Sequence, residues 1–225
     1  MSDHDHDHHH HHDHGTGPHR HPPAPDIQLS ERARRVLAMQ ELLIERGVIG
    51  PEDVRRSLDA ASGSPTNGAR LVARAWVDPA FKERLLADAV ATVQELGYEF
   101  PDHTGLVVLE DTPDLHHVIV CTLCSCYPGA LLGPPPDWYK SLPYRSRAVI
   151  DPRGVMREFG YDPGHDVEVR VMDSSAELRY MVLPLRPAGT DGMSEDELAQ
   201  LVVRDSMIGV RPALDPETVP IGAAD

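Results

Sequence analysis

The chain is poor in cysteine, in aromatic residues and in basic side chains. Its 225 residues include three cysteines, and aromatic residues make up 5%. Lys and Arg number 21 against 36 Asp and Glu, which gives a formal net charge of −15. This acidic balance argues against nucleic acid and anionic membranes as partners, because affinity for polyanions comes mainly from Lys and Arg. The few aromatic residues predict a lean core, completed in part by a partner chain.

Long hydrophobic runs are also missing. No stretch approaches the ~20 consecutive apolar residues of a membrane span, and the N-terminus has no basic region followed by an apolar one. We therefore expect a soluble, cytoplasmic protein. The three cysteines lie within six residues, a spacing too tight to cross-link distant parts of a fold. They indicate metal or redox chemistry in a reducing compartment.

The composition divides the chain into four parts. Residues 1–26 hold ten of the fourteen histidines and are predicted to be disordered. They are either an affinity tag or a native tail that gathers divalent metal ions. Residues 27–97 form a predicted helical arm, residues 98–210 an α/β metal-binding catalytic domain, and residues 211–225 a C-terminal tail. The expected fold class is α+β, with the arm followed by a layered α-β-β-α body.

Hydrophobic periodicity and capping signals place the elements. Helices are expected over 30–46, from Pro51 to the loop 62–68, and over 69–97 with a break at Asp78-Pro79. Apolar or alternating runs predict strands at 106–109, 118–120, 167–171 and 178–183. A short helix follows Asp151-Pro152, and a capping box over 194–197 opens the last helix.

The segment VCTLCSC at 120–126 carries the strongest chemical signal. A four-cysteine site would need a further thiolate, and the chain has none. Spacing by three and then by two wraps the chain around one point, so the amides of Ser125 and Cys126 lie as close to that point as the sulfurs. Three sulfurs and two amide nitrogens suit a six-coordinate, trivalent, Lewis-acidic ion with one open position.

Two other interpretations of this loop remain open. It could be a zinc knuckle completed by His116 or His117, or a redox dithiol. The two histidines are adjacent, so in a strand their side chains point to opposite faces and at most one could easily join the site.

The same run, with YPGALLGPPPDWYKSLPYRSRAV after it and RVMDSSAELRYMVLPLRPAGTDGMSEDELAQLVVRDSMIGV further on, resembles the α subunit of cobalt-type nitrile hydratase. The resemblance extends to ARLVARAWVDPAFKERLLADA in the helical arm. It implies a non-corrinoid Co(III) site, with Fe(III) less favoured, that hydrates a small nitrile to the amide. It also implies a β subunit, in an αβ or α2β2 assembly, and a metallochaperone or activator.

The resemblance assigns roles to individual residues. Cys121, Cys124 and Cys126 would supply the sulfurs, and Ser125 and Cys126 the amide nitrogens. Cys124 matches the sulfinic position and Cys126 the sulfenic position, which are successive stages of thiol oxidation. Thr122 matches a residue that is Thr in cobalt enzymes. The oxidised sulfurs would need two arginines of the β subunit, so this chain alone should be inactive.

The resemblance also implies a mechanism and an outer layer of residues. The nitrile nitrogen would bind the open position, and the carbon would be attacked by the Cys126 sulfenate oxygen or by a water that it activates. Asp173 and Glu177 match acids that position the metal loop, and Arg179 is a weaker member of that set. Without the resemblance, these residues would be interpreted as an ordinary solvated turn.

Two departures from the family pattern stand out. The family usually has Trp after Tyr-Pro, where this chain has Gly129, so a roomier pocket or a different substrate is expected unless the β subunit refills the space. The family's outer-shell glutamine upstream of the loop has no match in residues 101–104.

Two alternatives to nitrile hydratase are retained. The γ subunit of thiocyanate hydrolase shares the cobalt loop, but usually has Arg at the position of Gly129. A non-catalytic zinc or redox module would leave the cysteines unmodified.

Overall fold

The computed structural model describes residues 31–51, 63–100 and 103–219, in two compact units that divide at Gly50 and Pro51. In the first unit, helix α1 (Glu31–Glu45) confirms the helix expected over 30–46. Most of the helix expected from Pro51 lies outside the described residues. Over the described residues, no helix is long and apolar enough to cross a membrane.

Three consecutive helices open the described part of the second unit: α3 (Pro65–Val77), α4 (Pro79–Ala87) and α5 (Ala89–Glu95). Asp78 ends α3 and starts α4, because its carboxylate accepts a hydrogen bond from the amide of Phe81 at 2.9 Å. Asp88 does the same between α4 and α5. The break at Asp78-Pro79 is confirmed, whereas the break at Asp88 carries no proline and was not predicted.

The four predicted strands are confirmed and form two parallel pairs. Strand β1 (Gly105–Glu110) pairs with β4 (Leu178–Leu183), and β2 (Leu115–Val120) pairs with β3 (Glu168–Asp173). Strands β1 and β2 therefore belong to different sheets, as do β3 and β4, whereas the consecutive strands β2 and β3 share one sheet. Parallel partners need a long crossover, and the crossover from β2 to β3 carries most of the residues that surround the cysteine loop.

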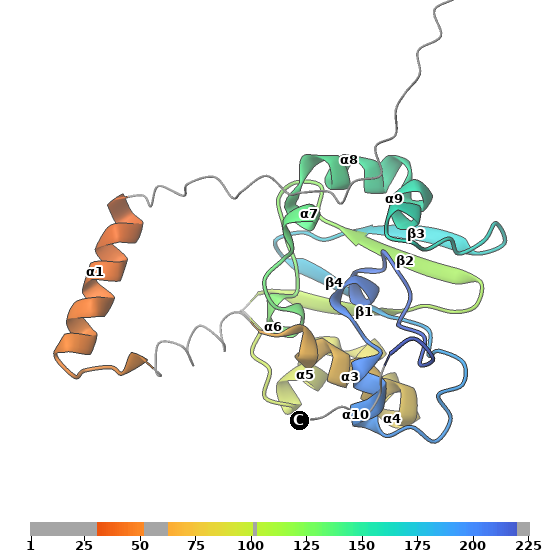
Figure 1. Cartoon of the computed structure of the whole chain (residues 1–225), viewed down its shortest axis with the longest axis horizontal. Helices are drawn as coiled ribbons and strands as arrows, with labels where there is room; N and C mark the ends of the chain where they lie inside the picture. The colour runs from red at the N-terminus through yellow and green to blue at the C-terminus, as the bar shows by residue number, and fades with distance from the viewer. Residues whose placement is uncertain (1–30, 52–62, 101–102, 220–225) are drawn as a thin grey trace, which may run out of the picture. The chain divides into compact units, whose positions relative to one another are not determined.

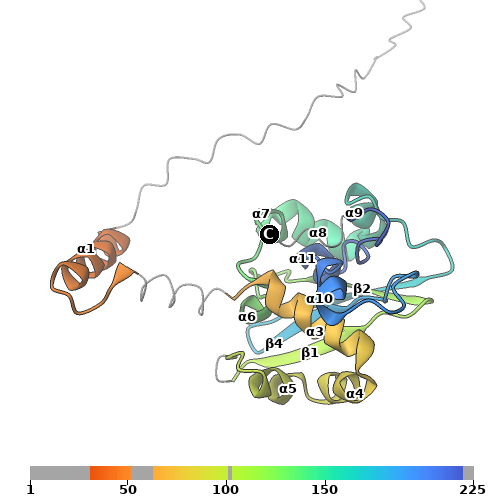
Figure 2. The same ribbon diagram turned by 60° about the horizontal axis from the view of Figure 1, so that its bottom comes forward.

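Helices cover both outer faces of the strand pairs, as Figures 1 and 2 show. Helices α4 and α5 contact β1 on one side, and β4 contacts β2 between the pairs. On the other side, α8 (Leu142–Ile150) contacts β2 and α9 (Pro152–Glu158) contacts β3. This arrangement confirms the layered α-β-β-α body. The core runs through β2, whose Val118, Ile119 and Val120 are buried immediately before the cysteines.

Several expectations need correction. The segment 62–68 is not all loop, because Ser64 caps the amide of Thr66 and α3 begins at Pro65. Four helices were not predicted: α6 (Gly129–Leu132), α7 (Asp137–Lys140), α8 and α11 (Arg204–Ile208). The helix that starts with the predicted capping box, α10 (Glu195–Gln200), is present but is not the last.

The helices assigned to the arm divide between the two units. Helix α1 belongs to the first unit, whereas α3 packs on α10 and α6, and α4 and α5 pack on β1. Their buried side chains explain this position, since Leu71, Phe81, Leu85 and Val93 all belong to the core. The end points at 26, 97 and 210 stay predictions.

A buried carboxylate joins the turn after β1 to both histidines of β2. Asp111 Oδ2 lies 2.9 Å from His116 Nδ1, and Asp111 Oδ1 lies 3.0 Å from His117 Nδ1. The other nitrogen of His116, Nε2, is 2.7 Å from the carbonyl oxygen of Gly209. Burial alone would lower the pKa of His116, but the bond and charge of Asp111 outweigh it and raise the pKa. Acceptors at both ring nitrogens thus favour the protonated form of His116.

We predict that Asp111→Asn destabilises this unit. Removing one partner of a buried ion pair costs about 3–5 kcal/mol, because the remaining charge loses its counter-ion. Chemical denaturation of the assembled protein measures this loss in the free energy of unfolding. The matched control is Glu158→Gln, which breaks an exposed ion pair with Arg147 and should change stability far less.

The pH dependence tests the same pair. Because the folded pKa of His116 lies above 6.5, its contribution is complete below about pH 6.5 and is lost as pH rises through the raised value. The stability gap between wild type and Asp111→Asn should therefore narrow with rising pH. A gap that is small at every pH, or that widens with pH, would contradict the assignment.

Candidate metal centre

Strand β2 ends at Val120 and leads directly into the three cysteines. The Sγ of Cys124 lies 3.4 Å from that of Cys121 and 3.1 Å from that of Cys126, and all three sulfurs lie within 4.8 Å of one another. Cys121 is buried, Cys126 is half-buried and Cys124 is exposed. The chain therefore wraps around one point, as the spacing predicts. We call residues 121–126 the cysteine loop.

The pairing of β2 with β3 places Asp173 beside the cysteine loop. Asp173 is the last residue of β3 and stands opposite Val120 in the register. One carboxylate oxygen accepts a hydrogen bond from the amide of Thr122 at 2.9 Å, and the other accepts from its hydroxyl at 2.6 Å. Two bonds to a carboxylate fix both the backbone and the side chain of Thr122.

The other two predicted outer residues occupy different surroundings. Glu177 is exposed, and its carboxylate accepts a hydrogen bond from the hydroxyl of Ser175 at 3.0 Å within the same turn. Arg179 lies on β4, and its positive charge acts on the thiol of Cys126 to lower that thiol's pKa. Its Nη1 is buried and has no hydrogen-bond partner among the described residues. Arg179 thus has a buried, unpaired donor, and its charge acts on the thiol of Cys126.

Further contacts come from the helices that the sequence did not predict. The hydroxyl of Tyr139, on α7, donates to the carbonyl of Cys126 at 2.9 Å. On α8, Tyr144 donates to the carbonyl of Ile119 at 2.5 Å. The neighbouring Arg145 donates from Nε to the carbonyl of Cys121 at 3.1 Å and from Nη2 to that of Thr122 at 2.6 Å.

A capping signal could have located α8. The hydroxyl of Ser141 accepts a hydrogen bond from the amide of Tyr144, and Pro143 stands in the first turn. Serine followed by an early proline is a helix start pattern. The many prolines and glycines over 128–136 are typical of a loop, and they obscured this signal.

The thiols of Cys124 and Cys126 differ in acidity. Hydrogen bonds from Cys126 and then Cys121 lower the pKa of the exposed Cys124 to about 7. Burial, together with the thiol of Cys124, raises the pKa of Cys126 to about 12 despite the charge of Arg179. Of these two, Cys124 therefore becomes a thiolate more easily, and the thiolate is the form that binds metal and reacts with oxidants.

The donor set fits a thiolate-bound transition metal better than a zinc knuckle. Over the part of the chain that the structure describes, no His, Asp or Glu side chain joins the three sulfurs in a metal-sized group. His116 and His117 are instead bound to Asp111. A tetrahedral structural zinc site would need a fourth side-chain ligand. The sulfurs and the loop's own backbone are the donors at hand, and the orphan donor of Arg179 suits oxygen atoms added to sulfur.

Residues 30–211 match the family described as nitrile hydratase, alpha chain. The chain belongs to this family. It is 54% identical over 182 residues to the low-molecular weight cobalt-containing nitrile hydratase subunit alpha of Rhodococcus rhodochrous, covering 80% of this chain and 88% of that protein. An Fe-type nitrile hydratase from Comamonas testosteroni Ni1, solved as a double mutant, superposes with a TM-score of 0.70 at 45% identity. That match covers 85% of this chain and 93% of the other.

The chain is also similar to a subunit of a second enzyme. The gamma subunit of thiocyanate hydrolase from Thiobacillus thioparus is 44% identical over 201 residues, covering 84% of this chain and 83% of that protein. Membership of the nitrile hydratase alpha chain family confirms the resemblance drawn from the cysteine loop. The Fe-type neighbour shows that the fold by itself does not choose the metal.

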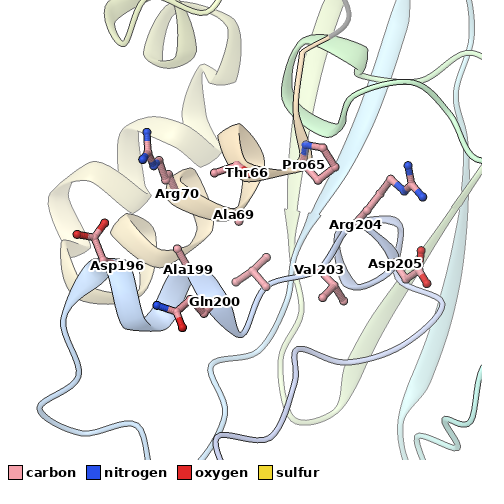
Figure 3. Close-up of a pocket in the computed structure, with 11 residues that line it drawn as sticks. Pro65, Thr66, Ala69, Arg70, Asp196, Ala199, Gln200, Val203, Arg204 and Asp205 are labelled. Atoms are coloured by element: carbon pink, nitrogen blue, oxygen red, sulfur yellow. The ribbon is translucent and has the colours of Figure 1, made fainter. Parts of the chain in front are cut away.

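A hollow of about 700 Å³ lies apart from the cysteine loop, between α3 and the segment from α10 to α11 (Figure 3). Arg70 and Asp196 stand toward one end of it and Arg204 with Asp205 toward the other. None of the predicted site residues lines this hollow. Its size is therefore no guide to where the chemistry occurs.

We predict an order of thiol reactivity in the metal-free protein. With a pKa of about 7 and an exposed side chain, Cys124 should react with iodoacetamide at about pH 7 well before Cys126, whose pKa is about 12. Peptide mass spectrometry after brief labelling measures the order. Faster modification of Cys126 than of Cys124 would contradict the geometry of the loop.

Proposed function

We propose that this chain is the α subunit of a cobalt nitrile hydratase, which hydrates a small nitrile to the corresponding amide. The observation that carries the proposal is the convergence of three cysteine sulfurs within 4.8 Å, on a loop whose Thr122 is bound by Asp173. Family membership supports the reaction, and the cobalt-containing relative supports the metal.

The cysteine loop would hold the ion through its own atoms. The donors proposed are the sulfurs of Cys121, Cys124 and Cys126 and the amide nitrogens of Ser125 and Cys126. When bound, Co(III) would supply a Lewis acid that makes the nitrile carbon more electrophilic. We propose that an external oxidant, dioxygen or a peroxide, oxidises Cys124 to the sulfinic acid and Cys126 to the sulfenic acid, which are successive stages of thiol oxidation.

Side chains of this protein would take part directly in the addition of water to the nitrile. The sulfenate oxygen of Cys126 either attacks the nitrile carbon or takes a proton from the water that attacks it. When water attacks, its oxygen ends on carbon and both its protons end on nitrogen, which gives the amide after tautomerisation. When the sulfenate oxygen attacks, that oxygen ends in the amide, and water then attacks the sulfur, which breaks the S–O bond to the product and restores the sulfenate. Arg179, with its free Nη1, would stabilise negative charge on the oxidised sulfur, while Asp173 holds the loop in place. Glu177 would act on the loop indirectly, through the turn in which it accepts a hydrogen bond from Ser175.

The surface around the loop supports a partner chain. Leu123 in the loop is 85% exposed, and Leu142 and Val149 on α8 are 72% and 54% exposed. On a helix, positions 142, 145 and 149 share one face, and Arg145 on that face contacts the loop. Exposed apolar side chains gathered around a polar site mark a protein interface. We propose that the β subunit covers this surface, in an αβ or α2β2 assembly, and that an activator delivers the metal.

Thiocyanate hydrolysis to carbonyl sulfide and ammonia is the second candidate, because the thiocyanate hydrolase gamma subunit is also a relative. Gly129 weighs against it. A Cβ placed on Gly129 would meet no atom within 4 Å, so the position has room for a cationic side chain but supplies none. An aromatic side chain at position 129 would fill this open space. Its absence favours a larger nitrile than such a filled pocket would accept.

The test uses the chain co-expressed with its β subunit in cobalt-containing medium. We expect amide formation from a neutral nitrile and no carbonyl sulfide from thiocyanate. The loop peptide should carry three added oxygen atoms, two on Cys124 and one on Cys126. Cys124→Ser should abolish cobalt incorporation while leaving the chain folded.

Other outcomes decide between the alternatives. Carbonyl sulfide release without nitrile hydration would favour the thiocyanate enzyme. Reduced thiols with bound zinc in the complete assembly would support a non-catalytic module and overturn both enzyme hypotheses.

A further inference from the structure

Arg145 reaches from helix α8 to the start of the cysteine loop, across 23 and 24 positions of sequence. Its Nε and Nη2 bind the carbonyl oxygens of Cys121 and Thr122, two consecutive residues. In an extended chain successive carbonyls point to opposite sides. The backbone must therefore turn here for two successive carbonyls to face one guanidinium. The planar fork of arginine fits this pair of acceptors, which a lysine ammonium would not.

The peptide group between Cys121 and Thr122 is held from both ends. Its carbonyl oxygen accepts from the Arg145 guanidinium at 3.1 Å, and its N–H donates to the Asp173 carboxylate at 2.9 Å. The Arg145 cation and the Asp173 anion thus bind opposite ends of one peptide dipole. Hydrogen bonds linked in this way polarise and strengthen one another. A peptide group turned the other way would lose both bonds.

This peptide directly follows Cys121, the first cysteine of the loop. It is the first peptide of the loop, and Cys121 Sγ accepts a hydrogen bond from the amide of Cys124 at 3.3 Å. Tyr144, the residue before Arg145, anchors α8 to Ile119 at the end of β2. The helix is therefore fixed to the buried strand, and Arg145 transmits that rigidity to the loop.

The charge of Arg145 is also available to the loop. Among the described residues, it donates hydrogen bonds to the two loop carbonyls, and no carboxylate forms an ion pair with it. A loop that binds metal through thiolates and deprotonated amides gains negative charge. A fixed guanidinium beside its first two carbonyls stabilises that state.

We propose that Arg145 is a positioning residue for the metal centre, which works with Asp173 to hold the Cys121–Thr122 peptide so that the three sulfurs and the following amides face one ion. This inference rests on the proposed function. It adds a residue on the crossover between β2 and β3 to the outer set predicted from the resemblance.

The experiment compares Arg145→Leu and Arg145→Lys with wild type, each co-expressed with the β subunit and cobalt. Loss of a residue that orients metal ligands weakens metal binding about 10–100-fold. We expect cobalt per complex to fall about tenfold or more in Arg145→Leu. Arg145→Lys should retain an intermediate amount, with a shifted sulfur-to-cobalt charge-transfer absorption. Both are measured by elemental analysis and spectroscopy, independently of activity.

The matched control lies two positions away on the same helix. Arg147 binds Glu158 at 2.6 Å, on the surface, so Arg147→Leu should keep wild-type cobalt content and absorption. A double variant, Arg145→Lys with Asp173→Asn, should lose little more cobalt than the worse single variant, because both residues act through one peptide group.

Each outcome decides the matter. Wild-type cobalt content and absorption in folded Arg145→Leu or Arg145→Lys would overturn the inference. If Arg145→Lys fails to assemble while Arg147→Leu assembles, Arg145 serves the packing of α8 and the inference is also overturned. A wild-type complex without cobalt or oxidised cysteines would instead contradict the proposed function.

Discussion

The parallel pairing of β2 with β3 is the constraint on which the candidate metal centre depends. It sets Val120 opposite Asp173, and this register puts a carboxylate beside the first residues of the cysteine loop. A slip of one residue would turn that side chain to the other face of the sheet. The side chains of Val118, Ile119 and Val120 oppose such a slip, because they are buried on both faces of the strand and would have to repack in a closely packed core. Hydrophobic burial in β2 thereby fixes the geometry of a polar site.

The crossover between these strands completes the surroundings of the loop. It carries Tyr139 to the carbonyl of Cys126 and Arg145 to the carbonyls of Cys121 and Thr122. The loop is thus held at its first residues and at its last, while the exposed Cys124 lies between these anchors. A rigid frame around an accessible thiol suits a site that binds a metal ion and is oxidised on selected sulfurs.

The sequence predicts local features of this fold well and long-range ones poorly. Apolar runs located the four strands, and Asp78-Pro79 located the break between α3 and α4, because both signals are contained within a few residues. The pairing of strands that lie far apart in the sequence has no such local signal. Helix α8 was missed because prolines and glycines precede it, although Ser141 and Pro143 mark its start. The sulfur cluster followed from spacing alone, Asp173 came from the family resemblance, and Arg145 was visible only in the structure.

The central claim is that an ion is held by three sulfurs and two main-chain nitrogens of one short loop. X-ray absorption spectroscopy at the cobalt edge of the assembled, cobalt-loaded protein tests it most directly. The account predicts a six-coordinate Co(III) with sulfur and light-atom scatterers in these proportions, and one further light atom at the open position. A four-coordinate tetrahedral ion, or the multiple-scattering signature of a bound imidazole, would contradict it.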